Sequence, residues 1–442
     1  MKIMVNKSMF ILAGLIIFFS PGKSQYPDTI DLFTCYREAE KNHPLGKQKE
    51  QYREAYELSI KNASNNWYPE LNANARASYQ SDITAISADP VTLPIPGVQP
   101  APQVDISQNI PTPKKDQYKM YMELNQAIYD GHATKRKKDK EDAHLQVNLK
   151  KNAVEIEKTK SQINQAYFSI LALSENKKIL EASLHQLNKQ KELIKSGIQN
   201  GILLNADLME LETRILELNQ QIREVTLRRR ASVVVLHQLT DLELSYQTHF
   251  KAPQITINAS QNIERPELEL FEAQQQELET TKQLVQSQRH PKVYAFGQAG
   301  YGRPGLNMLS DEFDAYYLIG AGVKWNIWDW HESKNEREIL TVNQQIVESQ
   351  QQHFERNIRI ALTGQLAEID HFETLLKSDD EIIQAREKIT STAGGKLQNG
   401  TITTTEYLSA QLKEQQAKLK KALHEVQLKK AKINYLTTKG NL

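Results

Sequence analysis

Apolar and polar side chains alternate in four short stretches of the chain. In residues 69–80 the odd positions from Leu71 to Tyr79 are apolar, while the even positions are polar. The same period of two runs through residues 117–128, 291–302 and 316–328. This period is typical of β-strands that have one apolar face, so the pattern predicts four strands arranged as two hairpins.

Heptads of apolar residues occupy most of the remaining chain, for example Leu149, Ile156, Ile163 and Ile170. They predict two long coiled-coil helices over residues 131–197 and 330–396, each about 100 Å long at 1.5 Å per residue. Shorter returning helices are predicted over 203–239 and 402–437, and two more helices, 44–67 and 266–290, lead into strands. The fold class is therefore mostly α with a small β part, and the long helices form antiparallel hairpins.

An internal two-fold repeat relates these elements. Pro69 aligns with Pro291 at an offset of 222 residues, and Asp130 aligns with Asp329 at an offset of 199. Repeats of this kind indicate one structural unit built twice. The offsets differ because residues 81–116 form a longer connection than their counterpart. Seven of the chain's fifteen prolines lie there, so this segment is expected to be an exposed, irregular loop.

The predicted division of the chain follows from the repeat. Residues 1–24 resemble a secretory signal peptide, with the apolar run "MFILAGLIIFF" before a small-x-small site. The first repeat spans 25–239, a linker spans 240–263, and the second repeat spans 264–442. Cleavage after residue 24 leaves a nearly neutral chain, which gives no reason to expect a nucleic-acid partner. The single cysteine, Cys35, excludes an internal disulfide and is expected to be a small apolar helix residue.

Two motifs resemble a cofactor-binding or metal-binding pattern, but neither has the context that such a site needs. "GYGRPG" at residues 300–305 matches a dinucleotide-binding pattern, but it ends an amphipathic strand instead of opening a helix. His132 and His331 each follow an aspartate by two positions, and two such ligands fall short of a metal site. The interpretation favoured over a metal site is that Asp130 and Asp329 cap the long helices. We therefore expect no enzyme, no cofactor and no metal.

Aromatic residues gather where the predicted strands meet the helices, and all four tryptophans of the chain are among them. Packing in a core would be the ordinary explanation in a soluble domain. A belt at a membrane–water interface explains the clustering better. The residues predicted for this belt are Trp67, Tyr129, Trp325, Trp328 and Trp330.

Four motifs, which recur in the second repeat, give the chain a family resemblance. They are "FTCYREAEKNHP", "WYPELNANA", "AIYDGHATKRK" and "QNGILLNADLMELE". In this order they resemble the TolC family of outer-membrane efflux and secretion channels over nearly the whole chain after residue 24. Four strands are too few to close a barrel of about eight or more strands. The resemblance implies that a homotrimer shares one twelve-stranded β-barrel, with the helices forming an α-helical barrel across the periplasm.

The resemblance also implies a function and partners. It predicts an outer-membrane channel of a tripartite efflux or type I secretion system, which works with a periplasmic membrane-fusion adaptor and an inner-membrane transporter. The alternative is a periplasmic coiled-coil adaptor or structural protein without a pore. The chain departs from the family pattern at two strand exits, where His132 and Trp330 replace a glycine.

The helical tips are the predicted functional residues. The turns expected to dock the adaptor are formed by Asn200 and Gly201 in the first repeat and by Asn399 and Gly400 in the second. Six residues after the glycines, Asp207 and Glu406 are predicted to form an acidic periplasmic gate. The other interpretation is that these two acids only stabilise the first turns of their helices.

Overall fold

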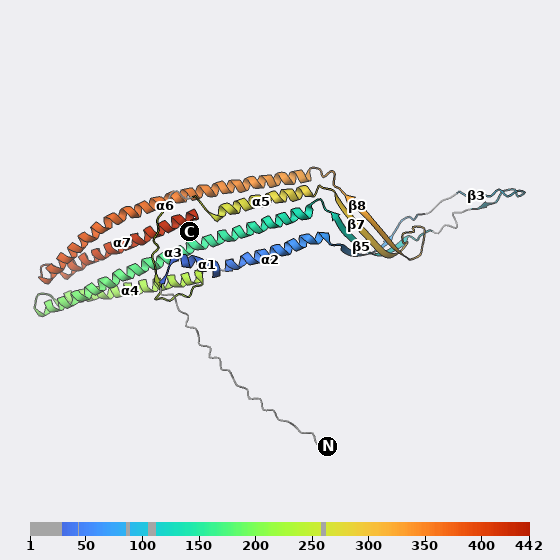
Figure 1. Cartoon of the computed structure of the whole chain (residues 1–442). Helices are drawn as coiled ribbons and strands as arrows, with labels where there is room; N and C mark the ends of the chain where they lie inside the picture. The colour runs from blue at the N-terminus through green and yellow to red at the C-terminus, as the bar shows by residue number, and fades with distance from the viewer. Residues whose placement is uncertain (1–28, 43, 85–88, 105–111, 258–261) are drawn as a thin grey trace, which may run out of the picture. The chain divides into compact units, whose positions relative to one another are not determined.

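A computed structural model describes residues 29–42, 44–84, 89–104, 112–257 and 262–442 of this chain. The predicted signal peptide, residues 1–24, lies outside them. Long helices and a small sheet make up the molecule (Figure 1). The chain divides into two compact units. One contains Gln162–Thr256 and Ile369–Ala431, and the other contains Pro44–Ser161, Ile257–Glu368 and Lys432–Leu442.

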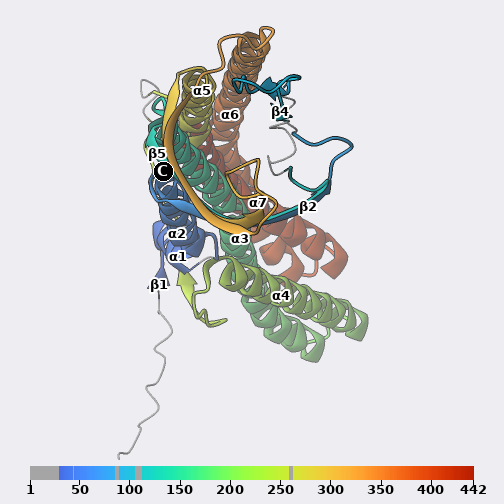
Figure 2. The ribbon, with the colours of Figure 1, turned by 90° about the vertical axis from the view of Figure 1, so that its right-hand side faces the viewer.

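The second unit contains an antiparallel sheet of four strands in the order β2-β5-β7-β8. The strands are β2 (Glu70–Tyr79), β5 (Asp116–Tyr129), β7 (Lys292–Arg303) and β8 (Asp314–Lys324). Figure 2 shows that the sheet is strongly curved. A small antiparallel sheet beside long helix pairs confirms the mostly helical fold class expected from the sequence.

The register of the sheet separates an apolar face from a polar one. Leu71 pairs with Leu124, which pairs with Gly297, which in turn pairs with Ile319. Ile319 is 79% exposed, and Met120 on the same face is 69% exposed. On the opposite face the side-chain amide of Gln298 donates a hydrogen bond of 3.2 Å to Glu123. The apolar face therefore points away from the protein core.

Two aromatic rings lie on the polar face over glycines of the neighbouring strand. Phe296 pairs with Gly320, and Tyr294 pairs with Gly322. A Cβ atom at either glycine would come within 2.6 Å of the facing ring. These distances show that the rings fill the space that a side chain on β8 would need.

The sheet corrects two predictions from the sequence. β8 ends at Lys324, so residues 325–328 continue the alternation without belonging to the strand. The proline-rich loop is not wholly irregular, because β3 (Val91–Thr92) pairs with β4 (Gln103–Val104). Proline cannot donate a hydrogen bond, but its carbonyl can accept one. The carbonyl of Pro102 accepts from the N–H of Leu93 at 3.0 Å and extends this short hairpin.

Two helices of 67 residues dominate the chain, α3 (Ala133–Gln199) and α6 (Glu332–Gln398). The returning helices are α4 (Asn205–Thr240) and α7 (Thr404–Lys439). All four begin two residues later than the heptads predict. For α3 and α6 the reason is that two residues before each helix adopt left-handed backbone angles. Among the described residues, no helix is both long enough and apolar enough to cross a bilayer.

The remaining helices are shorter. They are α1 (Leu32–Asn42), α2 (Pro44–Ser64), the single 3₁₀ turn η1 (Asn65–Trp67) and α5 (Pro266–Ser287). The start of α5 meets the end of α7, where the Arg265 side chain donates to the carbonyl of Thr437 at 2.9 Å. In the other unit, β1 (Thr29–Ile30) pairs in parallel with β6 (His249–Phe250).

Near the Gln-Asn-Gly turns the two helical hairpins share one buried cluster. Its members come from α3, α4, α6 and α7, and all belong to the first unit. They are Leu187, Ile194, Leu211, Leu397, Tyr407 and Leu408. Heptad positions on both hairpins thus pack against each other as well as within each hairpin.

Cys35 gives a direct test of the packing around α1. Its side chain is fully buried, and burial raises the pKa of the thiol to about 12. Because the thiolate is the reactive form, we expect no labelling by a thiol reagent at pH 8 in the native protein and complete labelling after denaturation. Rapid labelling of the native protein would contradict the burial of α1.

Candidate functional site

The first tip is a left-handed glycine turn that ends α3. Gly201 has a φ of +75°, which glycine adopts without steric cost. Its N–H donates to the carbonyl of Ile198 at 3.0 Å, and the N–H of Ile202 donates to that of Gly197 at 2.9 Å. This pair of bonds is the Schellman motif, which satisfies the last carbonyls of a helix.

The second tip has the same backbone turn as the first. Gly400 has a φ of +67°. Its N–H donates to the carbonyl of Leu397 at 2.9 Å, and the N–H of Thr401 donates to that of Lys396 at 2.9 Å. The recurrence of Gln-Asn-Gly in the sequence therefore corresponds to one turn geometry built twice.

The two acids after the tips lie at the start of the returning helices. Asp207 accepts a hydrogen bond from the N–H of Leu204, and Glu406 accepts one from the N–H of Thr403, each at 2.9 Å. Burial alone would raise the pKa of Asp207, but hydrogen bonds with Leu204 and Thr404 lower it overall. Within one chain both acids therefore stabilise helix N-termini, which is the second interpretation made from the sequence.

Polar contacts join the two tips to each other. The hydroxyl of Thr405 donates to the carboxylate of Glu210 at 2.8 Å. Arg214 donates to the side-chain carbonyl of Gln415 at 3.3 Å. Together with the buried cluster described above, these contacts place both glycine turns at the same end of the first unit.

The strand–helix junctions are capped by the two repeated aspartates. Asp130 accepts from the N–H of Thr134 at 2.7 Å, and Asp329 accepts from the N–H and the hydroxyl of Ser333 at 3.2 and 2.5 Å. Burial would raise the pKa of Asp130, but its hydrogen bonds, chiefly with Thr134, lower it. For Asp329 the hydroxyl of Ser333 is the main cause of a lowered pKa. These contacts confirm the capping role, and the described residues contain no group of three metal-binding side chains.

Left-handed backbone at both junctions is the feature that the sequence did not predict. Gly131 and His132 have φ values of +69° and +70°, and Trp330 and His331 have values of +51° and +67°. A residue other than glycine costs roughly 1–2 kcal/mol in this conformation. Gly131 cannot be replaced freely, because a Cβ there would lie 2.6 Å from the Cβ of His290.

The five predicted belt residues all lie near these junctions, and all are exposed. Trp330 is the most exposed, at 82%. The indole N–H of Trp325 donates to the carbonyl of Arg289 at 3.0 Å, while the ring remains open to the surroundings. Core packing, the alternative considered from the sequence, would have buried these rings.

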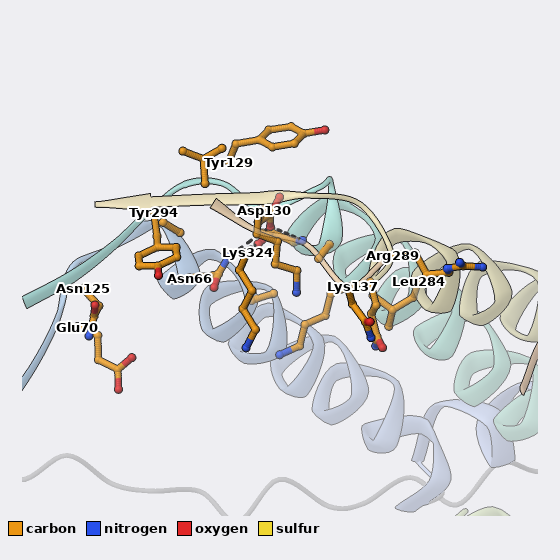
Figure 3. A pocket seen from close by; sticks show the side chains of 18 of the residues that line it. Asn66, Glu70, Asn125, Tyr129, Asp130, Lys137, Leu284, Arg289, Tyr294 and Lys324 are labelled. Carbon is orange, nitrogen blue, oxygen red and sulfur yellow. Dashed lines mark hydrogen bonds between the residues drawn. The ribbon is translucent and has the colours of Figure 1, made fainter. Parts of the chain in front are cut away.

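A cavity of about 1300 Å³ lies on the polar face of the sheet beside the junctions. Figure 3 shows Asn66, Lys137, Tyr294 and Lys324 around it; Tyr129 also lines it, but its ring points to the other side of the sheet. The cavity combines ends of strands and helices that are far apart in the chain. The polar residues that alternate along each strand were the only sign of this cavity in the sequence.

Comparisons with known proteins agree with this architecture. The sequence model of the family described as outer membrane efflux protein matches residues 35–241. The outer membrane protein VceC from Vibrio cholerae is similar in structure, with a TM-score of 0.64 and 14% identity over 92% of this chain and 96% of that one. The search of curated proteins found no sequence match.

Two further solved structures share the fold. The Campylobacter jejuni outer membrane channel CmeC has a TM-score of 0.64 and 14% identity, covering 93% of this chain and 85% of that one. The Neisseria gonorrhoeae outer membrane channel MtrE, in its open state, has a TM-score of 0.61 and 13% identity, covering 93% and 89%. At sequence identities this low, the structural matches show a common fold and nothing beyond it.

The tip glycines can be tested by substitution. Gly201→Ala and Gly400→Ala should each destabilise the tip by about 1–2 kcal/mol, because alanine is strained at positive φ. Gly395→Ala is the matched control, since Gly395 is helical and has no atom within 4 Å of the new Cβ. We expect this control to be neutral or stabilising by roughly 0.5–1 kcal/mol. Hydrogen exchange of peptides spanning the tips would measure both effects, and equal protection in all three variants would contradict the turn assignment.

Proposed function

This chain belongs to the outer membrane efflux protein family, and we propose that three copies of it assemble into one channel. As a member of this family the protein is an outer-membrane efflux channel and not an enzyme. Channels of the TolC family are trimers that work with adaptors. The proposal concerns how the residues of this chain build such an assembly.

The sheet carries the proposal, because it cannot be stable in lipid by itself. Its apolar face is exposed, and β2 and β8 lie at its two edges. Unpaired N–H and C=O groups at a sheet edge cost several kcal/mol each in a bilayer. Pairing β8 of one copy with β2 of the next satisfies both edges. Three copies then close a barrel of twelve strands, with the apolar face toward lipid.

The aromatic residues fit the same placement. Trp67, Tyr129, Trp325, Trp328 and Trp330 would lie where the barrel leaves the bilayer on the periplasmic side. Tyrosine and tryptophan favour this level of a membrane because their rings are apolar and their N–H or O–H groups stay hydrated. The long helices would then continue into the periplasm as an α-helical tunnel of about 100 Å.

The glycine turns would dock the periplasmic adaptor. Asn200, Gly201, Asn399 and Gly400 lie at the far end of the helical hairpins, and the space where a Cβ of Gly201 would lie is open. Three chains would present six such turns. The adaptor would connect them to an inner-membrane transporter, as part of a tripartite efflux or type I secretion system.

The acids after the tips would form the periplasmic gate. Three copies would bring Asp207 and Glu406 together as six carboxylates in a narrow aqueous throat, where like charges attract cations. Their helix-capping bonds support this role, because they hold the carboxylates in fixed positions. The lowered pKa of Asp207 keeps its carboxylate ionised at neutral pH.

A periplasmic adaptor without a pore was the alternative function. Such a protein would carry one helical hairpin inserted in a compact β domain. The present chain instead has two hairpins around a sheet whose apolar face is exposed. Membrane fractionation of the native protein separates the two functions: a stable oligomer in the outer membrane supports the channel, and a soluble periplasmic monomer would overturn it.

Arginine substitutions test which face of the sheet meets lipid. Ile319→Arg, in the middle of β8 on the apolar face, should cost about 2–4 kcal/mol of stability in the bilayer. Gln298→Arg, on the polar face of β7, is the control and should be tolerated because Glu123 is its neighbour. Folding into vesicles, followed by urea titration, would compare the variants. Equal losses at both positions would contradict the proposed orientation.

Conductance measurements test the gate. The double variant Asp207→Asn with Glu406→Gln should lower the selectivity of the channel for cations and weaken block by divalent cations, because the throat loses its charge. Glu224→Gln with Glu425→Gln removes two carboxylates about 25–30 Å further along the same helices and serves as the control. Unchanged selectivity and block in the tip variant would leave only the helix-capping role.

A further inference from the structure

The two junctions share a group of exposed side chains, and the proposed channel assigns a role only to the aromatic members of this group. At the repeat offset of 199 residues, an aromatic residue, a histidine and a lysine recur with the same spacing. We call these groups the junction triads. The first triad is Tyr129, His132 and Lys135, and the second is Trp328, His331 and Lys334.

Aromatic–histidine packing is the same in both triads. The ring of His132 lies edge-on to that of Tyr129, with centroids 5.5 Å apart and an angle of 88°. The ring of His331 lies edge-on to that of Trp328, at 5.4 Å and 75°. Both histidines have left-handed backbone angles, which cost energy at a residue other than glycine. The same strained geometry is therefore built twice, although glycine precedes one histidine and tryptophan the other.

The lysines lie one helical turn beyond the histidines, on the side of the helix away from the cavity. Thr134 and Lys137 of α3 line the cavity. At 3.6 residues per turn, Lys135 points to the opposite side of the helix. Lys334 occupies the equivalent place on α6, where Ser333 and Glu336 line the cavity. Both lysines are exposed.

Neither lysine is neutralised by a buried carboxylate. Lys334 lies 3.8 Å from Glu338, but both side chains are more than half exposed, so this ion pair contributes little. No ion pair of Lys135 occurs within the described part of the chain. Asp139, the counterpart of Glu338, pairs instead with Arg136 at 3.2 Å.

From these observations we propose that each junction triad binds the phosphate headgroup of an anionic phospholipid in the periplasmic leaflet. The lysine ammonium and a histidine N–H would donate to the phosphate oxygens, and the aromatic ring would lie beside the glycerol region. The exposed apolar face of the sheet starts directly next to the triads, so acyl chains can lie against it. A free phosphate ion would make only the polar contacts of this site, with the lysine and the histidine. The inference rests on the proposed channel function, which puts the junctions at the membrane surface.

Native mass spectrometry of the purified assembly can test the site. The protein would be supplied with equal amounts of phosphatidylglycerol and phosphatidylcholine, and the ratio of the two retained lipids measured. We expect the wild type to prefer phosphatidylglycerol. Lys135→Gln with Lys334→Gln should reduce that ratio about fivefold per site, since one lysine near an anionic surface contributes about a factor of five.

A matched control uses two other repeat-equivalent lysines on the same helices. Lys178 and Lys377 are also exposed, and they lie about 65 Å further along α3 and α6. Lys178→Gln with Lys377→Gln removes the same charge and should leave the lipid ratio unchanged. An equal loss in this control would overturn the proposal, because it would show a general charge effect.

The remaining outcomes separate the site from the channel function. A wild-type trimer without preference for phosphatidylglycerol would overturn the lipid site and leave the channel intact. Displacement of the lipid by excess inorganic phosphate would also overturn it, since it would assign the triads to free phosphate. A wild-type protein that is monomeric and does not insert into vesicles would refute the proposed function itself.

Discussion

Backbone groups at the two edges of the four-stranded sheet impose the constraint on which the rest of the architecture depends. β2 and β8 each have a neighbour on one side only, and the sheet is too narrow to curl onto itself. In the proposed assembly, contact between copies would join these two unlike strands. Interfaces of this head-to-tail kind close into rings when the rotation per copy fits. Each chain of the proposed trimer would therefore supply both halves of the interface, β2 on one side and β8 on the other.

At each junction the chain changes from a strand to a helix, and hydrogen bonds of one aspartate hold this change of direction rigid. Asp130 and Asp329 satisfy N–H groups of the first helical turn. Two left-handed residues follow each aspartate, and the strain of the non-glycine residues is offset by these capping bonds. Asn66, from the turn after α2, also donates to Asp130 at 3.3 Å. A single carboxylate therefore fixes the end of one strand, the start of α3 and the approach of the preceding chain segment.

Much of the fold could be predicted because each of its main elements has one apolar face and one polar face. Heptads gave the long helices, and alternation gave the two faces of the sheet, since each pattern follows directly from backbone geometry. The left-handed His132 and Trp330 could not be predicted, because such residues adopt this conformation only where their surroundings impose it. The end of β8 was missed because residues 325–328 continue the alternation without strand pairing. The cavity was missed because its walls come from segments more than a hundred residues apart.

Aromatic rings on the polar face of the sheet couple the residue sizes at paired positions of β7 and β8. Tyr294 occupies the space above Gly322, and Phe296 the space above Gly320. A larger residue at either glycine would displace the ring, and a smaller residue in place of the ring would leave its glycine uncovered. In each pair, the residue on β7 and the residue on β8 therefore compete for the same space. A larger residue at the glycine would therefore require a smaller one in place of the ring.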